Sequence, residues 1–217
     1  LETVTHGYKD IFDITGGGSG SCNNDVNCAG WEDWQVDKRS VGIMISGGSG
    51  FCTGTMVVDV PQSGTPYFLS ANHCMGGSQS AWVYRFNFEH TVCNQSATPV
   101  AQSLTGSVLR ASSANSDFAL IEINDVPPAN YNVYYAGWAN ENIAATEATG
   151  IHHPSGDVKK ISRENNSLTS NTWAGTAANS HWMVPGWDDG VTEGGSSGSG
   201  LWDQNHRLVG QLHGGAS

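Results

Sequence analysis

Charged side chains are scarce in this sequence, and basic ones are the scarcest. Asp, Glu, Lys and Arg make up only 13% of the 217 residues, and 9 Lys and Arg stand against 20 Asp and Glu, which gives a formal net charge of −11. Because a surface of that sign repels a phosphate backbone, we expect no nucleic-acid partner. The sequence also contains no run of about 18 apolar residues, so we expect no membrane span.

The cysteines lack the paired C-x-x-C spacing of zinc and redox sites. Five are present, all in the first half of the chain: Cys22, Cys28, Cys52, Cys74 and Cys93. Disulfides in an exported protein fit this pattern better than a metal does. Spacing alone cannot choose the pairs, because five cysteines allow many pairings that leave one thiol over.

Helical periodicity is also missing, whereas glycine is abundant at 28 residues. Short segments rich in β-branched and aromatic residues end at Gly, Ser, Asn or Pro, which is typical of strands. We expect strands at residues 40–46, 52–58, 67–71, 81–88, 117–123, 132–138, 181–187 and 207–213. Many short strands without helical crossovers predict an all-β protein, built as an antiparallel barrel or sandwich.

The first 20 residues differ in composition from the rest. They join a mildly apolar segment to a run of glycine and serine, which is typical of a leader tail or linker. We therefore expect the compact part of the chain to begin near Ser21.

The segment TEGGSSGSGLW (residues 192–202) is either a flexible loop or the site of a nucleophilic serine. A serine hydroxyl attacks a carbonyl only when an imidazole takes its proton and an acid orients that imidazole. The candidates are Ser197, His73 directly after an apolar strand, and Asp117 directly before one. Each alone has an ordinary explanation as a loop or turn residue.

Together the three residues predict a catalytic triad. Their order, His73, Asp117 and Ser197, is that of chymotrypsin-type proteases, and the gaps are wide enough to place the serine in a second barrel. Gly195 lets the backbone turn so that its N–H and that of Ser197 point at one carbonyl oxygen. The segment therefore predicts an oxyanion hole as well as a nucleophile.

Further motifs follow in an order known from one family. They are GSGSCNNDVNC, CTGTMV, FLSANHC, NSDFALIEI, AGW, GIHHPSGDVKKIS, GVTEGGSSGSGLW and RLVGQLHGG. The sequence resembles the trypsin-like serine proteases, and more closely the bacterial lysyl endopeptidases, from about Gly18 to its last residue.

The resemblance implies two antiparallel six-stranded β-barrels of the chymotrypsin type with the active site between them. The first barrel would span residues 21–130 and carry His73 and Asp117, and the second would span residues 131–217 and carry Ser197. Since the family pattern continues beyond the last residue, we expect the second barrel to be incomplete in this sequence.

The same resemblance implies the disulfides Cys52–Cys74 and Cys28–Cys93. Cys22 would then pair with a cysteine beyond the last residue. The Cys52–Cys74 bridge would anchor the loop that carries the catalytic histidine.

Three residues are implied to bind substrate. Trp173 matches a tryptophan that lies against the catalytic histidine in lysyl endopeptidases and limits its access to solvent. His213 and Gly214 fall on the strand that pairs with the substrate backbone and begins the specificity pocket.

The sequence departs from the trypsin pattern at two positions. Asn72 replaces a small residue beside the expected base, and Ser196 stands where animal trypsins have an aspartate that receives the new amino terminus. A serine cannot form that ion pair, so we do not expect the animal mode of activation. Adjacent His152 and His153 suggest zinc, but neighbours on a strand point to opposite faces, and we expect neither metal nor cofactor.

We therefore expect a secreted, bacterial, monomeric serine endopeptidase that cleaves proteins or peptides through an acyl-enzyme, with a preference for lysine implied by the resemblance. Lys9, the only basic residue before Cys22, would be its site of self-cleavage. One alternative is an inactive, protease-like binding module, although inactive relatives usually lack a triad residue. Another is a β-sandwich that binds carbohydrate through some of the 8 tryptophans, for which no motif is present.

Overall fold

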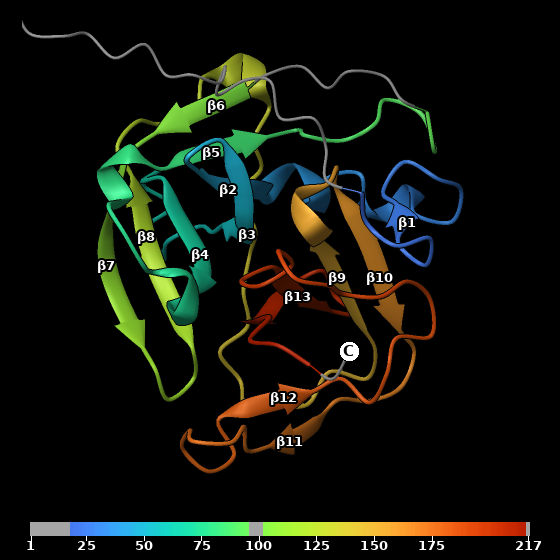
Figure 1. The fold of residues 1–217 in the computed structure, drawn as a ribbon. Coiled ribbons are helices and arrows are strands. Elements are labelled where there is room, and N and C mark those ends of the chain that lie inside the picture. The colour runs from blue at the N-terminus through green and yellow to red at the C-terminus, as the bar shows by residue number, and fades with distance from the viewer. Residues whose placement is uncertain (1–17, 96–101, 216–217) are drawn as a thin grey trace, which may run out of the picture.

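The computed structural model describes residues 18–95 and 102–215, and most of its regular structure is antiparallel β-strand (Figure 1). The all-β class predicted from the strand pattern is confirmed. Most of the expected leader tail, with Lys9, lies outside the described residues. No helix in the described ranges has the length and hydropathy that a membrane crossing requires.

The strands form three sheets. The first has seven strands, in the spatial order β6 (Gln102–Thr105), β5 (Val83–Phe86), β2 (Val41–Ser46), β3 (Ser49–Met56), β4 (Tyr67–Ala71), β8 (Phe118–Ile123) and β7 (Ser107–Ser113). The second has five strands, in the order β1 (Asn24–Asp25), β10 (Lys160–Glu164), β9 (Ala148–His152), β13 (Gly200–Asp203) and β14 (Leu208–Gln211). The third is the hairpin of β11 (Thr169–Asn171) and β12 (His181–Met183).

The helical segments are short 3-10 turns. They are η1 (Glu32–Trp34), η2 (Asp37–Ser40), η3 (Asn72–Cys74), η4 (Gln79–Ala81), η5 (Ala129–Tyr131) and η6 (Pro154–Gly156). Two of them matter for the site, because η3 carries His73 and η6 lies beside the loop that carries Ser197.

The strand numbers differ from the two six-stranded barrels that the resemblance implied. The two large sheets have seven and five strands within the described residues. Strand β1 pairs with β10 in the second sheet, although the expected first unit begins at residue 21, and the β11–β12 hairpin stands apart. Pairing between segments so far apart in sequence depends on tertiary packing, which a local pattern does not encode.

The prediction of a strand at residues 132–138 is wrong. This segment joins the two large sheets and makes only isolated bridges, at Ala136 with Val57 and at Trp138 with Leu208. Because its hydrogen bonds are divided between the end of β3 and the start of β14, it cannot join either ladder.

Each of the two large sheets has an apolar core of its own. Fully buried side chains from the first sheet include Met44, Phe68, Tyr84, Phe86 and Ile121, and those from the second include Ile151, Ile161 and Trp202. Val41 and Val57, at the ends of first-sheet strands, pack in the second cluster. The burial of Val41 and Val57 against the core of the second sheet therefore holds the two sheets together.

Candidate active site

His73 and Asp117 form a hydrogen-bonded pair at the ends of adjacent strands. The chain leaves β4 into η3, which carries His73, and Asp117 directly precedes β8, the neighbour of β4. The His73 Nδ1 lies 2.7 Å from Oδ2 of Asp117. Because a carboxylate can only accept, Nδ1 is the donor in this contact, and Nε2 is the ring nitrogen left for another partner.

The carboxylate of Asp117 is buried and held by backbone as well as side chain. Oδ1 of Asp117 accepts the backbone N–H of His73 at 2.9 Å, and the backbone carbonyl of Asp117 accepts the N–H of Asn72 at 2.6 Å. Asp117 is 3% exposed, whereas the His73 side chain is 40% exposed. Asn72 thus contributes through its main chain, and the imidazole presents its free edge to solvent.

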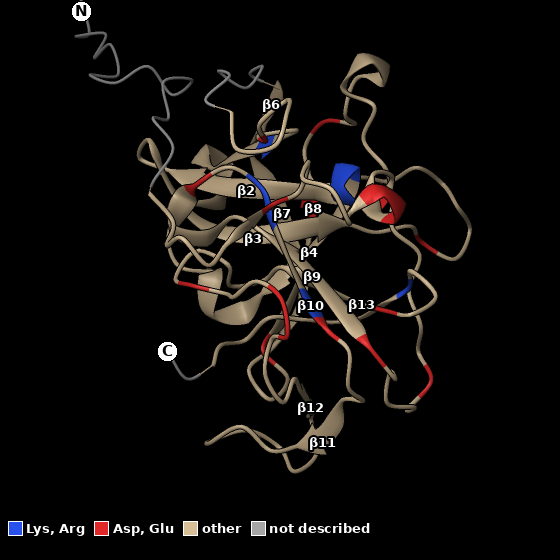
Figure 2. Ribbon diagram, turned by 90° about the vertical axis from the view of Figure 1, so that its right-hand side faces the viewer, with Lys and Arg blue, Asp and Glu red and all other residues tan. Residues whose placement is uncertain are grey.

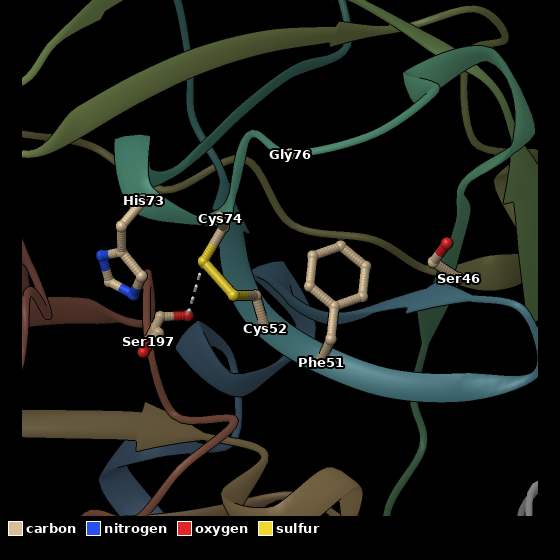
Figure 3. A pocket seen from close by; sticks show the side chains of 7 residues that line it. All are labelled: Ser46, Phe51, Cys52, His73, Cys74, Gly76 and Ser197. Atoms are coloured by element: carbon tan, nitrogen blue, oxygen red, sulfur yellow. Dashed lines mark hydrogen bonds between the residues drawn. A yellow bond between two sulfur atoms is a disulfide. The ribbon is translucent and has the colours of Figure 1, made fainter.

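Ser197 lies next to this pair. Figure 3 shows the side chains of His73 and Ser197 side by side at a pocket that Phe51 and Cys74 also line. Ser197 is partly exposed, and its carbonyl accepts the N–H of Thr53 at 2.8 Å. The three residues of the expected triad therefore converge from β4, β8 and the segment before β13.

The backbone around Ser197 has a fixed orientation. Gly195 has φ +91°, a conformation that favours glycine, and a Cβ there would lie 3.0 Å from the carbonyl of His153. The carbonyl of Gly194 accepts from Ser155 N at 2.6 Å, and that of Ser196 accepts from Ser199 N at 3.0 Å. In trans peptides the N–H opposes the carbonyl, so the N–H groups of Gly195 and Ser197 point away from these contacts. Neither donates a hydrogen bond within the part of the chain that the structure describes.

Ser196 also contacts a histidine. Its Oγ lies 2.8 Å from Nδ1 of His152, whose other nitrogen lies 3.1 Å from the Ser162 hydroxyl. Both Ser196 and His152 are 0% exposed, and within residues 18–95 and 102–215 no carboxylate contacts this imidazole. The pair is therefore closed to substrate, and His73 and Ser197 are the pair that faces the pocket.

His152 and His153, for which no metal is expected, have different contacts. The Nδ1 of His153 lies 3.0 Å from the carbonyl of Asp157, and its ring stacks on Phe88. Burial lowers the pKa of each histidine to about 3, with nearby lysines acting in the same direction. The two rings have separate partners.

Three aromatic side chains extend the site beyond His73. The His213 ring stacks on His73 with centroids 5.7 Å apart, and Trp173 packs on His213 at 4.7 Å. Trp173 thus packs on His213, which lies next to His73, and its ring also lies 6.4 Å from that of His181. The His213 Nδ1 is 2.9 Å from Nε2 of His181, and a Cβ on Gly214 would lie 3.3 Å from the Trp173 ring.

The structure has two disulfides, Cys52–Cys74 and Cys28–Cys93, which are the pairs that the resemblance implied, and the first lies at the site. The Cys52–Cys74 bridge joins β3 to the turn that carries His73, and the sulfur of Cys74 lies 4.0 Å from the carbonyl oxygen of Ser197 (Figure 3). Cys22 is exposed and has no disulfide partner among the described residues. Its bridge to a later cysteine stays a prediction.

A cleft of about 1110 Å³ lies next to the serine loop. Its lining includes Trp182, Trp187, Glu193, Gly200 and His213. Gly200 and Gly150 face the interior at strand positions, and a Cβ on Gly150 would lie 3.1 Å from the Trp187 ring. Apolar rings therefore line much of the cleft, and the Glu193 carboxylate accepts hydrogen bonds from Gly20, Asn23 and Ser155.

Sequence comparison places this geometry in a family. A sequence model described as lysyl endopeptidase, C-terminal domain, matches residues 16–217. A lysyl endopeptidase from Pseudomonas aeruginosa is 35% identical over 234 residues, which cover 97% of this chain and 48% of that protein. The chain belongs to the lysyl endopeptidase C-terminal domain family. It spans about half the length of this curated relative.

Solved structures share the fold of this family member. The thermostable serine protease AL20 from an extremophilic microorganism is 14% identical, with a TM-score of 0.59, over 84% of this chain and 88% of that one. Rv3671c from M. tuberculosis, in an inactive form, is 14% identical, with a TM-score of 0.52, over 85% and 79%. At such identities the likeness concerns the fold, and it confirms the chymotrypsin-type class.

Sequence reasoning missed several residues of this lysyl endopeptidase-family site. His181 was missed because a histidine at the start of a strand has no distinguishing local pattern. In the structure, burial and then the charge of His213 lower the pKa of His181. Ser162 and the contact of His152 with Ser196 were also missed. The order of motifs could not reveal them, because these contacts join β9, β10 and the serine loop only after folding.

Proposed function

We propose that this chain is the catalytic part of a secreted serine endopeptidase. The observation that carries the proposal is an exposed imidazole, His73, held at Nδ1 by the buried carboxylate of Asp117 and lying next to Ser197 at an open pocket. An inactive binding module would have no need of this arrangement.

The proposed reaction begins with the attack of Ser197 Oγ on a peptide carbonyl while Nε2 of His73 takes the hydroxyl proton. Asp117 keeps the proton on Nδ1 and stabilises the imidazolium that forms. The carbonyl oxygen becomes an oxyanion, which the free N–H groups of Gly195 and Ser197 stabilise. Each such donor contributes about 3 kcal/mol to transition-state stabilisation.

The tetrahedral intermediate then collapses. His73 gives its proton to the leaving amine, and Ser197 remains as an ester, the acyl-enzyme. Water, deprotonated by the same Nε2, attacks this ester and forms a second tetrahedral intermediate. When this intermediate collapses, the acid is released and Ser197 Oγ takes the proton back from His73. No metal or cofactor takes part in these steps.

Lysine is the proposed residue before the cleaved bond. Family membership supports it, since the P. aeruginosa relative carries the name lysyl endopeptidase. The rings of Trp182 and Trp187 in the cleft suit the methylene groups of a long side chain. Secretion is supported by the two disulfides, which persist in oxidising compartments.

The test compares three forms of the full-length protein: the wild type, Ser197→Ala and Ser196→Ala. We expect a fluorophosphonate to label the wild type, Ser197→Ala to lose labelling and peptide hydrolysis, and Ser196→Ala to keep labelling with much smaller losses. An unfolded protein that contains all residue types is digested with the wild type, and the fragments are identified by mass spectrometry. They should end in lysine.

Other results would contradict parts of the proposal. A labelled Ser197→Ala protein would make another serine the nucleophile. A folded wild type without labelling would favour the inactive binding module. Fragments that end in residues other than lysine would leave the chemistry in place and overturn the specificity.

A further inference from the structure

A chain of hydrogen bonds lies beneath the loop of residues 193–197. The Ser162 hydroxyl donates to the carbonyl of Val191 at 2.8 Å and lies 3.1 Å from Nε2 of His152. On the other side of the imidazole, Nδ1 lies 2.8 Å from Ser196 Oγ, which accepts the N–H of Glu193 at 3.1 Å. All the side-chain members of this chain are buried or nearly so.

These contacts determine where the protons lie. The Ser162 hydroxyl donates its one proton to the carbonyl of Val191, so it can only accept from His152. Nε2 must therefore carry the imidazole proton. Nδ1 then has only a lone pair, so the Ser196 hydroxyl donates to it. Every donor and acceptor in the chain is satisfied, in one direction, by neutral groups. Burial, and then Lys160, lower the pKa of His152 to about 3, which keeps the imidazole neutral.

Ser196 connects this chain to the proposed oxyanion hole. Its carbonyl belongs to the peptide whose N–H is that of Ser197, and it accepts from Ser199 N at 3.0 Å. Its own N–H donates to the carbonyl of Glu193 at 3.0 Å. The hydroxyl, the N–H and the carbonyl of Ser196 are thus all hydrogen-bonded. The peptide between Ser196 and Ser197 cannot rotate without breaking one of these bonds.

We propose, on the basis of the proposed function, that His152 is a positioning residue: through Ser196 it fixes the peptide whose N–H stabilises the oxyanion at Ser197. His152 and Ser162 do not touch the substrate. A neutral, fully hydrogen-bonded chain holds the loop without a buried ion pair, whose desolvation would be costly.

The kinetic test compares wild type, Ser196→Ala and Ser40→Ala. Ser40 is the matched control, because its hydroxyl is equally buried and bonds a backbone carbonyl, that of Asp37, outside the loop. For a lysine peptide anilide, we expect Ser196→Ala to lower kcat by about tenfold, which corresponds to one hydrogen bond, with KM unchanged. Ser40→Ala should keep the wild-type kcat and KM.

Binding of a peptide boronate separates positioning from a general loss of structure. The boronate bonds to Ser197 Oγ and places an oxygen where the oxyanion would form, whereas an uncleaved peptide amide inhibitor does not. Ser196→Ala should weaken the boronate by the same factor as kcat and leave the amide inhibitor unaffected. Unchanged boronate binding, or equal weakening of both inhibitors, would overturn the proposal.

The imidazole itself provides a measurement that needs no activity. In nitrogen NMR of the wild type, we expect the His152 ring, assigned by its loss in His152→Gln, to be the Nε2–H tautomer and not to titrate between pH 5 and 9. The opposite tautomer, or titration in that range, would overturn the chain of hydrogen bonds. A wild type that a fluorophosphonate does not label would contradict the proposed function, and this spectrum would still decide the hydrogen-bond chain.

Discussion

At the scale of single residues, Asp117 has the most constrained position in the site. Its φ of 54° lies in the left-handed region, which Asp tolerates better than most residues. Both carboxylate oxygens accept from His73, one from the backbone and one from the ring. The residue is therefore bound to a donor at each oxygen, and the two donors place different demands on a replacement.

Asp117→Asn should lower kcat by about 10,000-fold while the protein stays folded. The backbone N–H of His73 needs an acceptor, so the amide oxygen takes that place and the NH₂ group faces Nδ1. The imidazole then carries its proton on Nε2 and cannot act as a base. The measurement is single-turnover hydrolysis of a lysine peptide ester, with near-ultraviolet circular dichroism as the check on folding.

Asp203→Asn is the control for this change. Asp203 is as buried as Asp117 but pairs with Arg207 and not with a histidine. It should affect stability and leave kcat unchanged. If Asp117→Asn keeps a tenth or more of the wild-type kcat, Asp117 does not orient the base.

At the scale of elements, a buried ion cluster joins the first sheet to the second. Glu89, which follows β5, lies 2.6 Å from Lys38 of η2 and 3.1 Å from Lys159, which precedes β10. Lys159 is 0% exposed. Burial raises the pKa of Glu89, but the charges of Lys159 and Lys38 outweigh it and lower the pKa to about 2.

Glu89→Gln should destabilise the protein by about 3 to 5 kcal/mol at pH 7, because Lys159 is left buried without an opposite charge. The carboxylate stabilises the folded state fully above its unfolded pKa, near 4.5, and loses that effect as pH falls towards 2. The difference in unfolding free energy between wild type and Glu89→Gln should therefore shrink across that range. Urea unfolding at a series of pH values measures it.

The comparison variant is Glu122→Gln. Glu122 pairs with Arg110, whose side chain is half-exposed, so solvent screens the pair and its loss should matter far less. Similar destabilisation by both substitutions, or a Glu89→Gln effect that does not depend on pH, would mean that the cluster does not join the sheets energetically.

At the scale of the whole molecule, the charge balance leads us to expect faster association with basic peptides than with acidic ones. The net charge is −11, and Asp and Glu occur on connecting segments over much of the molecule, whereas Lys and Arg are few (Figure 2). An acidic surface attracts a basic peptide over a distance comparable to the Debye length, about 30 Å at 0.01 M salt and about 8 Å at 0.15 M.

Raising the ionic strength from about 0.01 M to about 0.15 M should therefore lower kcat/KM several-fold for a peptide with extra lysines around the cleaved bond. A matched peptide with glutamates in those places should gain or stay constant. The measurement is the initial rate at substrate concentrations far below KM. An equal response of both peptides to salt would show that long-range attraction does not contribute.

The sequence by itself determined the all-β class, the strand at residues 67–71, and the three residues proposed as the triad. These features are local. His73 and Asp117 adjoin apolar strands, and Ser197 lies in a glycine-rich segment, so each can be found within a few positions of a clear pattern. The order of the motifs then supplied the family, and with it the disulfide pairs.

Only the tertiary structure decided how distant segments meet. The β1–β10 pairing, the division of residues 132–138 between two sheets, and the contacts of His152 with Ser196 and of Glu89 with Lys159 join residues 44 or more positions apart. A buried histidine or lysine has the same letter as an exposed one. What makes it a positioning group or a counter-charge is the loss of water around it, which happens when the sheets close over it.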